Sequence, residues 1–260
     1  MKHLKTIYGP VASWRLGSSL GIDLLGSKNK LCSFDCIYCQ LGHLGEKTLD
    51  RNEYVSSQQL KDELHVCLSE VKPDVITFSG MGEPTLANNL QEAISIIRKQ
   101  TSIPLGILTN ASLMDVKEVR QSLMDLDFVV AKIDAHSEGL FKKINKPIDG
   151  VTIKNTINGI KQFNDNFNGK LSIQTMFMNQ NLKYAEEISE VIEKIQPNEV
   201  QINTPLRPCG IKPLDRNKID TIESIFKKKG LHTISVYSSK KPKTNPLDKM
   251  ELFRRRKSIL

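Results

Sequence analysis

The 260-residue sequence has no long hydrophobic run. No stretch approaches the roughly 20 apolar residues that a membrane-spanning helix needs. Residues 1–17 have no continuous apolar segment of the kind found in signal peptides. Aromatic residues are scarce at 6%, yet the hydrophobic share of 39% is that of an ordinary soluble protein with a sizeable core. The sequence therefore predicts a cytoplasmic protein that does not interact with membranes.

Cysteine is also scarce, with five residues in the whole chain. An odd number of cysteines, in a sequence without an export signal, argues against a disulfide framework. Cys32, Cys36 and Cys39 lie within eight residues of one another, whereas Cys67 and Cys209 stand alone. This uneven distribution indicates that the first three bind a metal.

Positive charge is concentrated near one end of the chain. The net charge is +8, and residues 240–257 contain eight basic and two acidic side chains, which together account for +6. Such a segment would suit the backbone of tRNA or another RNA. A solvated tail with no partner explains the same charges. We therefore expect two parts, a folded domain over 1–238 and a basic C-terminal tail over 239–260.

Short apolar runs alternate with longer stretches of helical periodicity, which indicates βαβ units and a parallel sheet. The predicted strands are 19–25, 74–79, 105–109, 127–133, 170–176 and 199–203, with a further edge strand at 231–237. The predicted helices are 56–71, 87–100, 113–125, 151–165, 182–196 and 214–229. Six units are too few for a closed eight-fold barrel. The expected fold is an open (β/α)6 partial TIM barrel with an N-terminal extension.

Polar and glycine residues follow several of the predicted strands. In parallel α/β folds the chemistry takes place at the C-terminal ends of the strands. The candidates at these ends are Gly80, Gly82, Glu83, Asn110, Asp134, Gln174 and Asn203.

The loop Cys32-Ser-Phe-Asp-Cys36-Ile-Tyr-Cys39 directly follows the first predicted strand. Thiolates are soft ligands that suit iron–sulfur clusters or zinc. A loop with only three cysteines leaves one iron of a cluster open for a substrate or cofactor. The alternative is a structural zinc ion in a non-catalytic RNA-binding protein, with His43, Cys67 or Cys209 as the fourth ligand.

This C-x3-C-x2-C loop, with Tyr38 before the last cysteine, resembles the signature of radical S-adenosylmethionine (SAM) enzymes. The resemblance implies a [4Fe–4S] cluster on Cys32, Cys36 and Cys39, and an open iron that chelates SAM. It also implies reductive cleavage of SAM to a 5′-deoxyadenosyl radical, which abstracts a hydrogen atom from a substrate. The expected activity is that of an iron–sulfur oxidoreductase or transferase that receives electrons from a reductant such as flavodoxin or ferredoxin.

Other strand-end residues extend the resemblance. The stretch Ser79-Gly-Met-Gly-Glu-Pro84 is similar to the superfamily's glycine-rich segment, which holds the amino group of SAM. Asp134 resembles the polar residue on strand four that contacts the SAM ribose or carboxylate. Gln174 and Asn203 are similar candidates, as are Tyr38 and Asn110, although a structural capping role explains single residues equally well.

Residues 8–17 and 19–21 resemble an uncharacterised radical SAM group related to wybutosine-synthesis iron–sulfur oxidoreductases. Trp14 and Arg15 in this segment either line the site or pack the open edge of the barrel. Only Cys67 and Cys209 remain for a second cluster, which makes wybutosine-type ring formation doubtful. An activase that acts on a protein partner stays open.

Cys209 follows the sixth predicted strand, on the face where a substrate should lie. We expect it to donate a hydrogen atom, to form a covalent link, or to have no role. Arg207 would favour the thiolate if the two side chains met, and it could equally bind a phosphate or carboxylate of the substrate. Cys67 lies in a predicted amphipathic helix, where a buried and inert thiol is the default.

Overall fold

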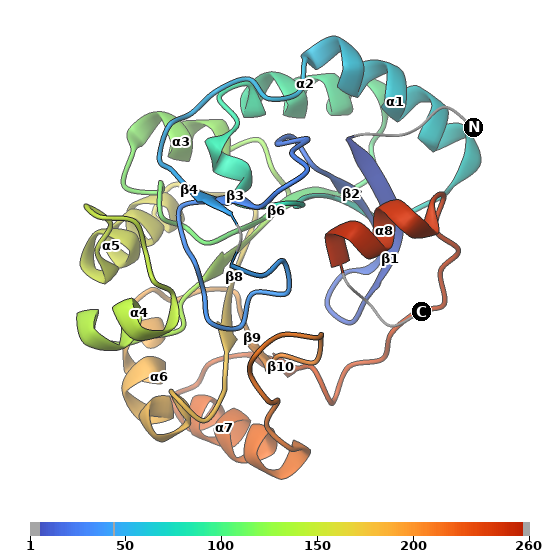
Figure 1. Cartoon of the computed structure of the whole chain (residues 1–260). Coiled ribbons are helices and arrows are strands. Elements are labelled where there is room, and N and C mark those ends of the chain that lie inside the picture. Colours follow the sequence, from blue (N-terminus) through green and yellow to red (C-terminus); the bar gives the residue numbers. More distant parts are fainter. Residues whose placement is uncertain (1–5, 44, 257–260) are drawn as a thin grey trace.

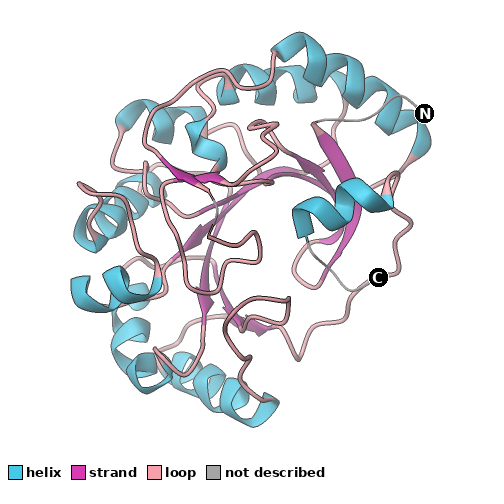
Figure 2. Cartoon of the chain, in the orientation of Figure 1, coloured by secondary structure: helices cyan, strands magenta, loops and turns pink. Residues whose placement is uncertain are grey.

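The computed structural model describes residues 6–43 and 45–256. Eight strands form one curled sheet, and helices surround its outer side (Figure 1, Figure 2). In spatial order the strands are β1 (Ile7–Ser13), β2 (Gly17–Ile22), β5 (Val75–Phe78), β6 (Leu105–Thr109), β7 (Phe128–Lys132), β8 (Lys170–Met176), β9 (Glu199–Asn203) and β10 (Thr233–Ser235). A separate two-stranded sheet joins β3 (Leu31–Cys32) to β4 (Glu46–Lys47). The molecule is a half-barrel, as the sequence predicts.

Among the described residues, every helix but the last lies between strands in sequence and surrounds the convex face of the sheet, whereas the last one follows β10 and packs against β1. The helices are α1 (Ser57–Glu70), α2 (Leu90–Gln100), α3 (Lys117–Ser122), α4 (Glu138–Ile144), α5 (Ile153–Asn164), α6 (Ala185–Glu193), α7 (Arg216–Lys228) and α8 (Lys249–Arg256), with short 3-10 turns at Pro84–Leu86 and Leu182–Tyr184. All six predicted helices are present, and the one predicted over 113–125 is reduced to α3. Neither α4 nor α8 was predicted from the sequence. No helix of the described residues is long and apolar enough to cross a membrane.

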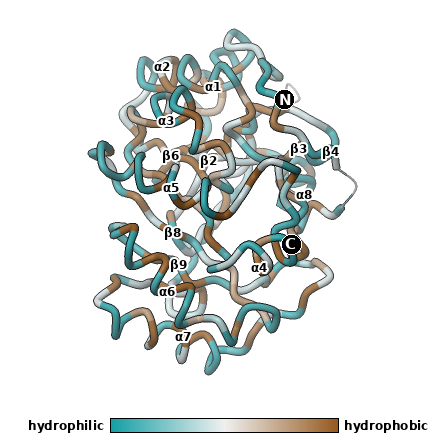
Figure 3. The backbone as a smooth tube through the Cα atoms, turned by 90° about the vertical axis from the view of Figure 1, so that its left-hand side faces the viewer, coloured by the Kyte–Doolittle hydropathy of each residue, from teal (hydrophilic) through white to brown (hydrophobic). Residues whose placement is uncertain are grey.

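Alternation along β8 and β9 separates an apolar outer face from a largely polar inner face. The outward side chains Ile76, Ile107, Val129 and Ile173 pack against the helices in the main hydrophobic core. The intervening positions on β8 and β9 point the other way, as a side-chain period of two requires. Hydrophilic and hydrophobic residues correspondingly alternate along the outer helices in Figure 3. The concave side of the half-barrel is therefore available for polar ligands.

Strand β1 corrects the expectation of an entirely parallel sheet. It pairs antiparallel with β2 and extends the sheet at its open edge. Tyr8 on this strand lies over Gly21 so closely that a side chain at position 21 would overlap its ring. The segment contains a glycine and a proline, and so it lacks the uninterrupted alternation by which a strand is recognised. At the other edge, β10 confirms the predicted strand at 231–237 and pairs parallel with β9.

The first predicted strand ends earlier than expected, at Ile22 rather than Leu25. Asp23 consequently stands at a strand end, where its side chain is 1% exposed.

Helix α8 carries part of the basic C-terminal segment back to the barrel, where it packs against β1 (Figure 1). The backbone N–H of Leu247 donates a 2.6 Å hydrogen bond to the Gly9 carbonyl. Arg255 is fully buried, whereas Lys240, Lys241 and Lys243 are exposed. Residues 249–256 are therefore not a solvated tail. Lys257 lies outside the described residues, and the domain division after 238 stays a prediction.

Candidate functional site

The cysteine loop is joined to the glycine-rich stretch through backbone hydrogen bonds. The N–H of Leu31 donates to the Met81 carbonyl at 2.8 Å, and the N–H of Glu83 donates to the Leu31 carbonyl at 3.0 Å. A Cβ atom on Gly82 would overlap the Leu31 carbonyl oxygen, so only glycine permits this approach. The two motifs that the resemblance links in sequence therefore lie side by side in space.

The other side of the loop is held by the segment that follows α4. The N–H of Ile37 donates to the Ile144 carbonyl at 2.9 Å, and the N–H of Ile148 donates to the Ser33 carbonyl at 2.9 Å. The rings of Phe34 and Phe141 pack edge to face with centroids 5.3 Å apart. Backbone bonds on both sides fix the course of the loop before any cofactor binds.

Two asparagine amides approach the sulfur atoms. The side-chain nitrogen of Asn110 lies 3.5 Å from Cys32 Sγ, and that of Asn145 lies 3.5 Å from Cys36 Sγ. Hydrogen bonds to the ligand sulfurs are among the features that tune iron–sulfur clusters. Asn110 is a predicted site residue. Asn145 was not predicted, because it follows no strand and instead caps the C-terminal end of α4.

The thiols fit a cluster better than a single ion. Burial, together with the charge of Glu83, raises the pKa of Cys32, and burial together with the charge of Asp134 raises the pKa of Cys36 to about 12. Such thiols lose their protons when a metal binds. No three His, Cys, Asp or Glu side chains in the described ranges gather closely enough to hold one metal ion. A cubane binds each thiolate to a different iron, so the sulfurs need not converge on one point.

The Glu83 side chain forms hydrogen bonds with the segment after β5 and with the end of β6. Its carboxylate accepts hydrogen bonds from the Thr85 N–H (3.1 Å) and hydroxyl (2.7 Å), the Thr109 hydroxyl (2.6 Å) and the Asn110 N–H (2.6 Å). Burial nevertheless raises the pKa of this carboxyl group. The side chain ties β5 to β6 and sets Asn110 beside Cys32. Its predicted contact with a cofactor stays a prediction.

Asp134 connects the cysteine loop to the ends of α4 and β8. It accepts hydrogen bonds from the Tyr38 hydroxyl, from the Asn145 amide at 2.8 Å and from the Met176 N–H at 2.7 Å. Lys132 lies 3.3 Å from this carboxylate and 5.0 Å from the centroid of the Tyr38 ring. Burial and the negative charge of Asp134 raise the pKa of Tyr38, which keeps its hydroxyl proton in the hydrogen bond.

Gln174 and Asn203 lie farther along the same edge. The Gln174 carbonyl oxygen lies 3.4 Å from Lys132 Nζ, while its amide nitrogen is buried with no hydrogen-bond partner in the part of the chain that the structure describes. The Asn203 side chain accepts a 2.9 Å bond from the Thr204 N–H, which is the local capping role. An unpaired buried donor is costly, so Gln174 fits a polar ligand on the concave side.

The sequence analysis missed Asp23, which lies against the glycine-rich stretch. A Cβ atom on Gly80 would overlap its carboxyl group, and the Met81 N–H donates to it at 3.3 Å. Arg255 pairs with the same carboxylate at 2.9 Å. A strand end at Ile22 would have revealed Asp23 as a candidate. Nothing in the sequence pattern pairs it with residue 255.

The two isolated cysteines lie in different surroundings. Cys67 is 1% exposed in the core beneath α1, as expected of an inert thiol. Cys209 lies in the loop after β9, and its thiol is 3.5 Å from the Ile211 carbonyl. The Arg207 guanidinium donates to Gln40 at 2.8 Å instead of meeting this thiol. His43, the alternative zinc ligand, has a half-exposed side chain whose Nδ1 lies 2.9 Å from an Asp35 carboxylate oxygen.

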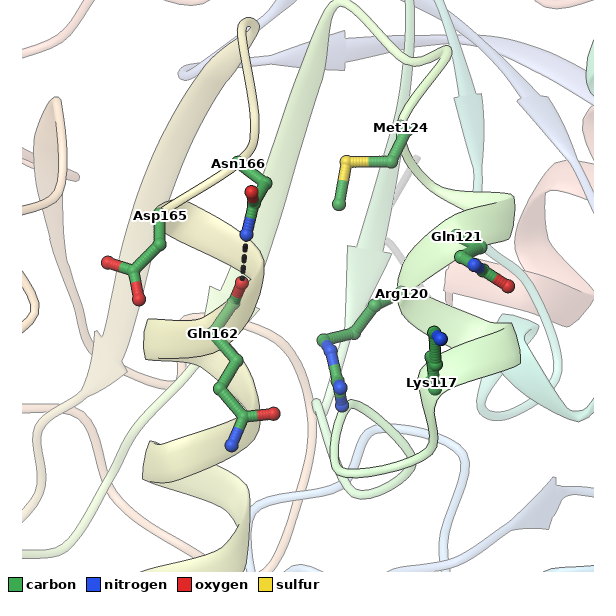
Figure 4. A pocket seen from close by; sticks show the side chains of 7 residues that line it. All are labelled: Lys117, Arg120, Gln121, Met124, Gln162, Asp165 and Asn166. Carbon is green, nitrogen blue, oxygen red and sulfur yellow. Dashed lines mark hydrogen bonds between the residues drawn. The ribbon is translucent and has the colours of Figure 1, made fainter.

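A surface cavity of about 440 Å³ lies between α3 and α5 (Figure 4). Arg120 and Gln162 project into it from the two helices. Both helices run from their C-terminal ends into the start of the next strand, so the cavity lies toward the N-terminal ends of β7 and β8. None of the predicted site residues lines it. It is separate from the site built around the cysteines.

The fold is a partial barrel with a three-cysteine loop at the C-terminal ends of its strands. A family model of the radical SAM superfamily matches residues 28–192, which include the cysteine loop and the ends of β5 to β8. The chain belongs to the radical SAM superfamily.

Curated relatives extend the match. The chain is 41% identical over 211 residues to the UPF0026 protein slr1464 of Synechocystis sp., covering 81% of this chain and 78% of that protein. It is 36% identical over 226 residues to the UPF0026 protein MJ1312 of Methanocaldococcus jannaschii, covering 84% and 69%. Neither name mentions wybutosine synthesis, so that narrower resemblance stays a prediction.

Solved structures confirm the fold. A radical SAM methyltransferase from Sphaerobacter thermophilus superposes with a TM-score of 0.64 at 13% identity, covering 84% of this chain and 66% of that one. SuiB of Streptococcus suis bound to S-adenosylmethionine gives a TM-score of 0.62 at 17% identity, covering 80% of this chain. This chain spans about half of SuiB, at 48%. At such identities the likeness shows the partial barrel and not a shared substrate.

Proposed function

We propose that the protein binds a [4Fe–4S] cluster through Cys32, Cys36 and Cys39 and reductively cleaves SAM there. The observation that supports this most is the attachment of the cysteine loop to the Gly80–Glu83 stretch through Leu31. When bound, the cluster and SAM supply a 5′-deoxyadenosyl radical that abstracts a hydrogen atom from a substrate. Superfamily membership and the SAM-bound form of SuiB are consistent with this cofactor.

The residues of the chain have separate tasks in this proposal. Asn110 and Asn145 donate to the sulfurs and orient two of the three ligands. Met81 and Gly82 fix the distance between the loop and the segment that receives the amino group of SAM. Gln174 offers its unpaired amide donor to the cofactor from β8. Asp134 holds Tyr38 and Lys132, so the edge of the site keeps its shape as ligands enter.

An anaerobic assay with SAM and dithionite, analysed for 5′-deoxyadenosine, tests the proposal. Wild type should be brown, bind about four iron atoms and form the product. Cys36→Ala should lose both the cluster and the cleavage, while the matched variant Cys67→Ala should keep both. Full cleavage by Cys36→Ala would refute the assignment. Colourless protein with stoichiometric zinc would support the zinc-binding alternative instead.

RNA remains our proposed substrate class, and an activase acting on a protein partner is the second candidate. Lys240, Lys241 and Lys243 are the exposed charges that support RNA contact. Replacing all three with glutamine should weaken RNA binding and flatten its dependence on salt. Binding that is unchanged in the triple variant would refute a role for this segment. Flavodoxin or ferredoxin is the proposed reductant.

A further inference from the structure

Three arginines that are distant in sequence come together at the open side of the half-barrel. Arg15 lies in the turn between β1 and β2, Arg207 in the loop after β9, and Arg256 at the end of α8. We call these three residues the arginine group. Their charges act on one another, since Arg256 lowers the pKa of both Arg15 and Arg207, and Arg15 also lowers that of Arg207.

Hydrogen bonds place the arginine group next to the proposed SAM site. Arg256 Nη2 donates to the Tyr8 hydroxyl at 2.8 Å and to Ser79 Oγ at 2.9 Å. Ser79 immediately precedes the Gly80–Glu83 stretch. Arg207 Nη1 donates to Gln40, the residue after Cys39, whose amide in turn donates to the Arg255 carbonyl at 3.2 Å. The arginine group therefore extends between the cysteine loop and the end of β5, and α8 lies alongside (Figure 1).

The positive charge of the arginine group is not balanced. Within residues 6–43 and 45–256, none of the three forms an ion pair, whereas the neighbouring Arg254 and Arg255 both do. Glu199 is near enough to act on Arg15, but its carboxylate already accepts bonds from Lys170, Ser172 and Gln201.

Donors of the arginine group also lack partners. Arg15 Nε and Arg256 Nε are buried and have no hydrogen-bond partner among the described residues. Burial and mutual repulsion lower the pKa of Arg15 to about 10 and that of Arg207 to about 9. Grouped guanidinium ions with unpaired donors are destabilising unless an anion joins them. The planar fork of each guanidinium matches carboxylate and phosphate oxygens.

We infer that the arginine group binds a terminal oxyanion of the substrate, a carboxylate or a phosphate monoester, and thereby directs the rest of the substrate toward the cysteine loop. That the oxyanion belongs to a substrate rests on the proposed function, whereas binding of the oxyanion itself does not. The arginine side chains are partly buried between β1, α8 and the cysteine loop, which suits the end of a molecule. A continuous RNA backbone would instead need an open, exposed track.

Calorimetric titration of the full-length protein without its cluster tests the inference independently of SAM cleavage. Inorganic phosphate and malonate serve as probes at fixed ionic strength, and they distinguish the two oxyanion sources. Arg15→Gln, Arg207→Gln and Arg256→Gln should each weaken binding of the preferred probe by about tenfold or more. Lys61→Gln, which removes one exposed charge from α1, should leave it unchanged.

Circular dichroism and the melting temperature establish that each variant is folded. Because the three arginines belong to different elements, undocking of α8 in Arg256→Gln would not explain a loss in Arg15→Gln or Arg207→Gln. Unchanged affinity for both probes in all three variants would overturn the inference. So would variants that lose SAM binding but retain the probe, because the arginines would then serve the cofactor. Absence of 5′-deoxyadenosine would refute the proposed function alone.

Discussion

The guanidinium of Arg255 donates a 2.9 Å hydrogen bond from Nε to Asp23 Oδ2, across 232 residues of sequence. Both side chains are buried, with exposed fractions of 0% and 1%. Asp23 also accepts from the Met81 N–H and lies against Gly80. The end of α8 is thus connected to the end of β2 and to the segment proposed to hold SAM. Burial raises the pKa of Asp23, and Arg255 opposes that rise.

Replacing Arg255 with leucine should destabilise the protein strongly. Removal of one partner from a buried ion pair leaves an uncompensated charge, at a cost of about 3–5 kcal/mol. Arg254→Leu is the matched control, because Arg254 pairs with Glu251 on a more exposed part of the same helix and such pairs contribute about 0–1 kcal/mol. Urea unfolding gives both free energies. Equal losses in the two variants would show that helix packing, not the buried pair, is being measured.

Replacing Gly82 with alanine should prevent the cysteine loop from docking. The added Cβ would overlap the Leu31 carbonyl, a backbone atom that cannot move without disturbing Cys32. We expect loss of most of the bound iron and a lower melting temperature. Gly139→Ala is the control, since nothing lies within 4 Å of a Cβ at that position in α4. The measurement is the iron content after anaerobic reconstitution. The prediction is wrong if Gly82→Ala binds as much iron as wild type and Gly139→Ala.

The fold was largely predictable because its strands and helices carry strong periodic patterns. Residues 105–109 and 199–203 form strands at the predicted bounds. The first is a short, mostly apolar run and the second alternates apolar with polar side chains, and both patterns are typical of strands. The cysteine loop and the Gly80–Glu83 stretch were recognisable for a different reason. Their residue types follow from chemistry that few other residues can perform, namely thiolate ligation and close backbone approach.

The missed features depend on contacts that no local pattern encodes. Asn145 reaches Cys36 only because α4 ends beside the cysteine loop, and a lone asparagine after a short helix is indistinguishable from a C-cap. Arg255 was interpreted as part of a charged tail, since a run of arginines is usually solvated. Its burial follows from its pairing with Asp23, which lies inside the strand predicted over 19–25 and in the structure follows the end of β2. Long-range pairing of this kind requires the tertiary structure.

Replacing Asn145 with alanine should weaken the cluster without abolishing it. The amide donates toward Cys36 Sγ at 3.5 Å and to Asp134 at 2.8 Å, so its loss removes a bond to a ligand sulfur and loosens the Tyr38 contact. Loss of such outer partners typically lowers metal affinity or activity about 10- to 100-fold. Iron release to a chelator over time measures the effect. Asn155→Ala, on the exposed side of α5, should release iron at the wild-type rate.

Glu199 should make the stability of the protein depend on pH in the acidic range. Burial raises its pKa, but hydrogen bonds from Lys170, Gln201 and Ser172 outweigh burial and hold the pKa below the usual 4.5. A carboxyl group with a lowered pKa in the folded state stabilises the protein above about pH 4.5 and loses that contribution as the pH falls through the folded-state pKa.

Glu199→Gln removes the titrating group and keeps its size. At pH 7 the variant should be less stable than wild type by roughly 1.5–3 kcal/mol, the range for a hydrogen bond to a charged group. The difference should shrink as the pH is lowered below 4.5, because wild type alone loses the contribution. Urea unfolding at several pH values measures it, with Glu190→Gln as the control, since Glu190 pairs with Lys229 on the exposed face of α6. A difference that grew toward low pH would mean that the pKa of Glu199 is raised in the folded protein, and that burial outweighs its hydrogen bonds.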